Sequence, residues 1–83
     1  NPAAGSPTVT FEVGAAGRVV LDIFDLQGRR VRRLVDIDRP LGLATETWDR
    51  ADDAGRPVRA GVYFYRLTAG DRRATGRIVL VGR

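Results

Sequence analysis

The chain has 83 residues, a formal net charge of +4 and 43% hydrophobic residues, which is enough for one small domain and no more. It contains neither cysteine nor histidine. This excludes disulfides, thiolate metal sites and the side chain that most often acts as general base or zinc ligand. We therefore expect no enzyme activity and no cofactor. Methionine is also absent, which leads us to expect a piece of a longer protein.

The positive net charge is typical of proteins that bind nucleic acid or an anionic membrane surface, so both are considered as partners. All of the basic residues are arginines, and the densest group lies within residues 29–33. No aromatic side chain is interleaved with this group to stack on bases, so we favour a solvent-exposed strand face and expect no nucleic-acid partner. No apolar run approaches the roughly 18–20 residues of a membrane span, so we expect no transmembrane segment.

Short segments with alternating apolar and polar residues follow one another between glycines and prolines. A linker-like segment over residues 1–7 precedes a first strand over 8–13, and no helical period is present. Six further strands are expected over residues 18–25, 30–35, 43–49, 57–59, 62–69 and 73–81. Gly28 supplies the positive φ for the turn between the second and third strands. Seven short strands at this spacing predict a single all-β sandwich over residues 8–83, with an open barrel as the alternative.

The apolar positions of these strands predict the core. Trp48 and Tyr63 are expected between the sheets. The other expected core residues are Val9, Phe11, Val19, Leu21, Ile23, Val31, Leu34, Val58, Tyr65 and Leu67. Asp22 and Asp25 could form a pair of acids, but no base follows them, so we interpret them as part of a solvated face.

Three aspartates, Asp49, Asp52 and Asp53, precede Gly55 and resemble part of a calcium loop. Calcium needs six to eight oxygen ligands, and three carboxylates supply only part of that number. A loop in which aspartates cap their own backbone explains the same residues. We favour the loop and expect no metal.

Two stretches carry a family pattern. The first is Val19-x-Leu21-x-Ile23-Phe24-Asp25-Leu26-x-Gly28-Arg29-x-Val31-Arg32-x-Leu34. The second begins at Trp48-Asp49 and continues as Asp53-x-Gly55-x-Pro57-Val58-x-Ala60-Gly61-Val62-Tyr63-Phe64-Tyr65-Arg66-Leu67. Over essentially its whole length the chain is similar to the immunoglobulin-like domain of flagellar hook-capping proteins. It resembles even more closely the type A C-terminal sorting domain of type IX secretion cargo, from which it departs at Glu46 and Gly82.

This resemblance implies a seven-stranded antiparallel immunoglobulin-like (fibronectin III-like) β-sandwich. It further implies a non-catalytic sorting module at the C-terminus of a larger secreted bacterial protein, read by an outer-membrane translocon and displayed at the cell surface. The expected recognition element is Arg77, Ile78, Val79, Leu80, Val81 and Arg83. The alternative is a structural or adhesive immunoglobulin-like module of an extracellular or cell-surface assembly.

The last strand differs from the others because residues 78–81 are all apolar. Apolar groups therefore lie on both of its faces, and the outer face is either covered within the domain, which we favour, or meets a partner. The strands over 8–13 and 73–81 are expected at sheet edges, where self-assembly by strand addition is possible. Charged side chains at a sheet edge oppose strand addition, and the candidates for this role are Arg72, Arg73 and Arg77.

Overall fold

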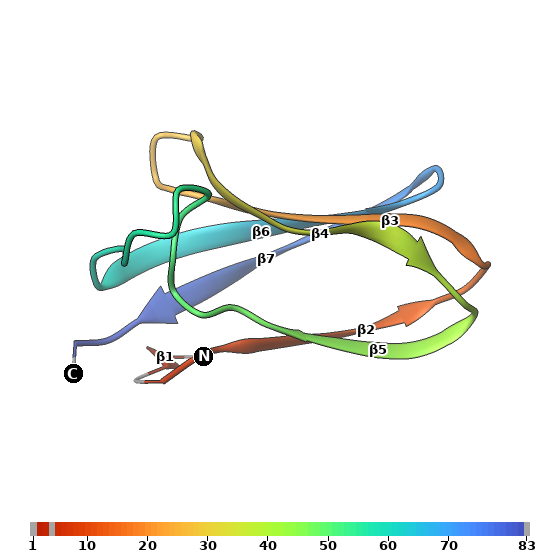
Figure 1. Cartoon of the computed structure of the whole chain (residues 1–83), viewed down its shortest axis with the longest axis horizontal. Coiled ribbons are helices and arrows are strands. Elements are labelled where there is room, and N and C mark those ends of the chain that lie inside the picture. The colour runs from red at the N-terminus through yellow and green to blue at the C-terminus, as the bar shows by residue number, and fades with distance from the viewer. Residues whose placement is uncertain (1, 4, 83) are drawn as a thin grey trace.

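The computed structural model describes residues 2–3 and 5–82, which form two facing β-sheets (Figure 1). One sheet has the strand order β1-β7-β6-β3-β4, and the other pairs β2 with β5. The strands are β1 (Pro2–Ala3), β2 (Thr8–Val13), β3 (Gly17–Phe24), β4 (Arg30–Arg39), β5 (Gly42–Thr47), β6 (Gly61–Ala69) and β7 (Arg72–Leu80). The described part contains no helix that is long and apolar enough to cross a membrane.

The all-β, two-sheet architecture agrees with expectation, but the set of strands does not agree fully. Strands β2–β7 pair antiparallel, whereas β1 is a two-residue strand that runs parallel to β7 and falls within the segment 1–7. The expected strand over 57–59 is wrong. Only an isolated bridge joins Pro57 to Ala51 there, because proline lacks the N–H that a ladder requires.

The chain passes between the two sheets at both ends of the molecule, and the loop 48–60 makes the crossing from β5 to β6 (Figure 1). The chain crosses between the sheets from β2 to β3 and from β4 to β5, at the same end of the molecule. The β3–β4 turn, the loop 48–60 and the end of β7 lie at the opposite end. Gly28 has φ 81° in that turn, as its predicted role requires.

The core lies between β2 and the inner face of the larger sheet. Residues 9, 11 and 13 of β2 alternate inward, and Leu21 and Ile23 of β3 are fully buried opposite them. Trp48 and Tyr63 meet edge-on, with ring centroids 5.4 Å apart and an interplanar angle of 76°. Phe11 is buried as well, while Tyr65 and Leu67 are partly buried and pack against the core.

Strand β4 is less regular than the pattern of its sequence suggested. Its pairing with β3 shifts register twice, which leaves Leu34 and Val31 each as an extra residue in a β-bulge. The bulges reset the alternation, so Arg33 pairs with Asp22 while Arg32 reaches Asp49 and the Ala51 carbonyl. The arginine group is thus not a uniformly solvated face.

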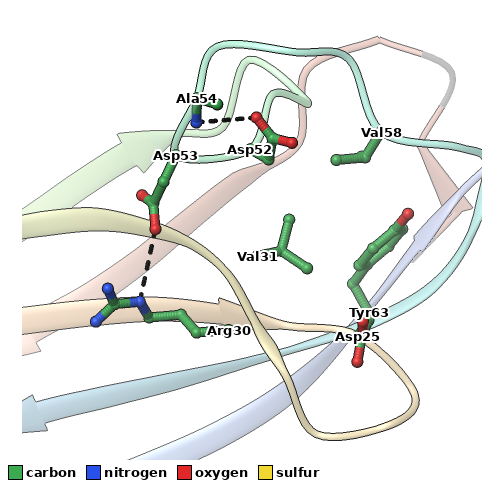
Figure 2. Close-up of a pocket in the computed structure, with 8 residues that line it drawn as sticks. All are labelled: Asp25, Arg30, Val31, Asp52, Asp53, Ala54, Val58 and Tyr63. Carbon is green, nitrogen blue, oxygen red and sulfur yellow. Dashed lines mark hydrogen bonds and ion pairs between the residues drawn. The ribbon is translucent and has the colours of Figure 1, made fainter.

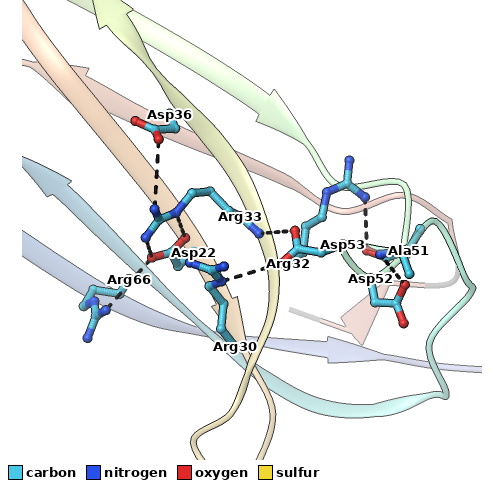
Figure 3. Close-up of polar contacts among 10 residues, drawn as sticks. Asp22, Arg30, Arg32, Arg33, Asp36, Ala51, Asp52, Asp53 and Arg66 are labelled. Atoms are coloured by element: carbon cyan, nitrogen blue, oxygen red, sulfur yellow. Dashed lines mark hydrogen bonds and ion pairs between the residues drawn. The ribbon is translucent and has the colours of Figure 1, made fainter.

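Asp22 is the clearest correction to the expected solvated face, because only 2% of its surface is exposed. Arg33 donates two hydrogen bonds to its carboxylate, at 2.9 and 3.1 Å, and Arg66 lies 4.0 Å from the same group (Figure 3). The Asp22 carboxylate raises the pKa of the Arg33 guanidinium. A buried carboxylate is tolerated here because it is paired and hydrogen-bonded.

Candidate functional site

The predicted recognition residues of β7 lie partly in the core and partly on the surface. Ile78 and Leu80 point inward and are 5% and 2% exposed. Arg77 is exposed, Val79 is half-buried on the outer face, and Val81 is 37% exposed just beyond the strand. Arg83 lies outside the described residues. Arg77, Val79 and Val81 are therefore the side chains of this segment that solvent can reach, whereas Ile78 and Leu80 anchor the strand in the core.

The outer edge of β7 is only partly covered. Strand β1 pairs with it at two positions, Pro2 with Val79 and Ala3 with Leu80. Within the described residues no strand pairs with this edge over 72–78. A groove of ≈ 400 Å³ lies between β7 and the neighbouring edge of β2, lined by residues 6–10, Tyr65, Arg77 and Ile78. The structure thus places both predicted edge strands beside an opening.

Arg50 holds the two ends of the described chain. Its side chain is 5% exposed, and its guanidinium donates to the carbonyl of Gly5 at 3.3 Å and to that of Val81 at 2.9 Å. Its backbone has φ 63°, the one positive value among the described non-glycine residues. That conformation is unfavourable for a residue with a Cβ. The hydrogen bonds of the Arg50 side chain and the packing of the loop stabilise this left-handed conformation despite its cost.

The three aspartates of the expected calcium loop face different partners. Asp49 accepts hydrogen bonds from Arg32 and from the backbone N–H of Ala51. Asp52 accepts from two backbone N–H groups of its own loop, and Asp53 accepts from the backbone N–H of Arg33 at 2.8 Å. Among the described residues no group of three acidic side chains is arranged to hold a metal ion. The carboxylates instead shape the loop and fasten it to β4.

The charge state of Asp52 follows from this geometry. The backbone N–H of Arg56 stabilises the carboxylate and, with that of Ala54, holds the pKa of Asp52 below its ordinary value of 3.8, although partial burial opposes this. The anionic form is therefore the one that the loop requires.

Two aromatic residues anchor the same loop from inside. The Trp48 indole N–H donates to the carbonyl of Ala51 at 2.9 Å, and the Tyr63 hydroxyl donates to the carbonyl of Arg59 at 2.7 Å. Burial raises the pKa of the Tyr63 hydroxyl, which keeps it a hydrogen-bond donor. The loop that carries Arg50 is thus fixed to the core at both of its ends.

An open hollow of ≈ 430 Å³ lies between this loop and the β3–β4 turn, and Figure 2 shows its lining. Val31, Val58 and Tyr63 form its floor, and carboxylates and Arg30 form its rim. Asp25 accepts from the backbone N–H groups of Gln27 and Arg29. The carboxylates of Asp25, Asp52 and Asp53 thus accept backbone hydrogen bonds that shape the turn and fasten the loop.

No protein-family model and no curated protein sequence matches the chain. Its fold, however, is found in a solved structure. The chain resembles part of PorU from Porphyromonas gingivalis. The match is to the crystal structure of dimeric latent PorU, with a TM-score of 0.80 and 22% sequence identity.

The likeness to PorU spans 100% of this chain and 9% of the PorU chain. At this identity it establishes the fold alone. The chain thus has the fold of a small part of PorU.

Two features of the region where β1 meets the end of β7 could not be predicted from the sequence: the buried Arg50 and strand β1 itself. An arginine beside a turn is ordinarily exposed, so nothing in the sequence distinguished Arg50. Strand β1 has only two residues and no alternation that could reveal it. Both features depend on where the chain's two ends meet in space.

Proposed function

We propose that the chain is a non-catalytic sorting module of a larger secreted bacterial protein, carried at its C-terminus and read by an outer-membrane secretion machinery. The parent protein would be displayed at the cell surface. The motif resemblance to type A sorting domains of type IX secretion cargo supports this proposal, and so does the PorU-like fold, which spans the whole chain. The resemblance also supports an immunoglobulin-like classification of the sandwich.

The observation that carries the proposal is the exposed side of β7. Arg77 and Val79 face outward, and Val81 continues past the strand. A receptor can contact these side chains without opening the core. It can also pair with the free main-chain groups of the β7 edge and place carboxylates against the guanidinium of Arg77.

The test is export of a reporter fused to the N-terminal side of the chain in a host with a type IX secretion system. The intact fusion should reach the cell surface. Removing Gly82 and Arg83 should leave it in the periplasm, and Arg77→Glu should weaken export. Arg72→Glu is the matched control because Arg72 lies at the opposite end of β7. Surface substitutions of this kind change stability by only about 0.5 kcal/mol.

The outcomes separate the two functions. If the truncated fusion still reaches the surface, residues 82–83 are not part of the signal that the secretion machinery recognises. If the intact fusion remains in the periplasm, the sorting function is wrong, and a structural or adhesive module of a surface assembly takes its place.

A further inference from the structure

Two phenylalanines and two arginines form a row across the outer face of the larger sheet. In the strand registers, Arg30 of β4 pairs with Phe24 of β3, Phe24 pairs with Phe64 of β6, and Phe64 pairs with Arg77 of β7. Side chains directly opposite one another in antiparallel pairs lie on the same face. The row therefore places two aromatic rings at its centre and one guanidinium at each end.

The neighbouring rows extend this pattern. Val62 pairs with Val79 on one side of the row, and Asp22 pairs with Arg66 on the other. The Arg66 guanidinium carbon lies 4.8 Å from the centroid of the Phe24 ring, a cation–π geometry that holds the arginine in place. We call this surface the phenylalanine–arginine face; it consists of Phe24, Arg30, Val62, Phe64, Arg66, Arg77 and Val79.

The face is accessible over its apolar centre. Phe64 is 39% exposed, and Phe24, Val62 and Val79 are half-buried. No other described element lies over this side of the sheet (Figure 1). Aromatic residues and arginines are the side chains most enriched at the centres of protein interfaces.

The charge of the face is positive. The row that contains Phe24 and Phe64 has no carboxylate, and the neighbouring row that contains Arg66 has one, that of Asp22. Asp22 is buried and already accepts hydrogen bonds from Arg33. Arg30 is 3.6 Å from Asp53, and Arg77 makes no ion pair within the described part of the chain. The guanidinium of Arg77 is thus available beside the apolar centre, and Arg30 and Arg66 keep N–H donors beyond those that face Asp53 and Asp22. Carboxylates are the groups that guanidiniums bind bidentately.

We propose that the phenylalanine–arginine face is a docking surface for an acidic protein segment, one that carries aspartate or glutamate around aromatic or aliphatic side chains. A second copy of this chain fits poorly, because face-to-face contact would set arginines against arginines. A lipid surface also fits poorly. Insertion requires side chains that project several ångströms into the interface, whereas Phe24, Val62 and Val79 are half-buried in the sheet and Phe64 is only 39% exposed.

The proposal goes beyond sorting and is tested without secretion. A phage-displayed library of random 16-residue peptides is selected on the folded 83-residue chain, and enriched peptides are synthesised and titrated against it. We expect selected peptides that combine acidic with aromatic or aliphatic residues, and an affinity that falls as salt rises.

Matched variants locate the binding. Phe64→Ser should weaken it at least about tenfold, as loss of a central aromatic does, and Arg77→Glu should also weaken it. Leu43→Ser removes a side chain that is 77% exposed on the other sheet and should leave affinity unchanged. Arg72→Glu, on the opposite face of β7 by strand alternation, should do the same. Circular dichroism checks that each variant is folded.

Three results would overturn the proposal. The first is a selection that yields no binders or no enrichment of acidic residues. The second is affinity that survives both Phe64→Ser and Arg77→Glu. The third is Phe64-dependent binding to vesicles of 30% phosphatidylglycerol in phosphatidylcholine, which would assign the face to a membrane surface instead.

Discussion

Replacing Arg50 tests whether one buried guanidinium joins the two ends of the domain. Arg50→Ala removes the donors to the carbonyls of Gly5 and Val81 and keeps the left-handed backbone under strain. Arg50→Gly removes the same donors but relieves that strain, because glycine adopts positive φ freely. The two variants therefore separate the side chain's contribution from the backbone's cost.

The magnitudes follow from these contacts. A hydrogen bond to a charged group contributes about 1.5–3 kcal/mol. Because Gly5 and Val81 are exposed enough for water to replace part of the loss, we expect Arg50→Ala to lower the free energy of unfolding by about 2–4 kcal/mol. The left-handed conformation costs a residue with a Cβ about 1–2 kcal/mol. Arg50→Gly should therefore be more stable than Arg50→Ala by about 1 kcal/mol.

Two measurements check this. Urea unfolding gives the stability order of the parent chain and the two variants, and about 1 kcal/mol corresponds to a Tm change of about 4–8 °C in a domain of this size. Heteronuclear NOE values for Val81 and Gly82 report whether the end of the chain has been released. Both variants should show lower values there than the parent.

Arg50 does not join the two ends of the domain if Arg50→Ala stays within about 0.5 kcal/mol of the parent chain, the range of ordinary surface substitutions. If Arg50→Gly proves less stable than Arg50→Ala, the backbone at this position is not left-handed. Unchanged NOE values at Val81 would show that the guanidinium does not hold the tail.

Four further predictions concern the core, the sheet, the loop and metal binding. Trp48→Ala should cost about 3–5 kcal/mol, and red-shifted tryptophan emission from the folded parent would contradict the burial on which this rests. Gly76→Ala should destabilise by about 1–3 kcal/mol, because its Cβ would lie 2.3 Å from the Tyr65 ring; if the cause is this clash, Gly76→Ala should cost less in a Tyr65→Ala background than in the parent chain. The lowered pKa of Asp52 means that its contribution to stability is present above its ordinary value of 3.8 and is lost as pH falls through the folded-state value. Asp52→Asn should therefore flatten the fall of Tm between about pH 5 and pH 2, and an unaltered acid profile would refute the role. A chelator should leave Tm unchanged, and a large drop would restore the calcium loop.

Most of the sandwich could be predicted because one face of each regular strand is buried. Strand β2 lies over residues 8–13, as its alternation predicted, and β3 lies within one residue of its expected range. Strand β4 extends to Arg39, beyond the expected range 30–35, because residues 36–39 continue the ladder with β3. The charged side chains there are paired, Asp36 with Arg18 of β3 and Arg39 with Glu46 of β5 in the other sheet. Glu46, a departure from the family pattern, forms an ion pair with Arg39 and leaves β5 regular.

The candidate site was harder to predict than the fold. The position of the apolar run at residues 78–81 was evident from its sequence, but which of its side chains remain accessible depends on the sheet that β7 joins. The phenylalanine–arginine row depends on four strands arriving in one register, and two bulges in β4 set that register on one side. Alternation within a single strand contains no such information.

The alternation of the strands, the lack of histidine and cysteine, and the turn at Gly28 can all be read from the amino-acid sequence. These are local properties, since side-chain spacing and backbone preference act over a few residues. The burial and pairing of Asp22, and the contacts of Arg50 with Gly5 and Val81, are evident only in the folded chain. The physical reason is that a charged group's environment is set by partners far away in the sequence. Arg33, Gly5 and Val81 become neighbours of these two residues only when the sheets have formed.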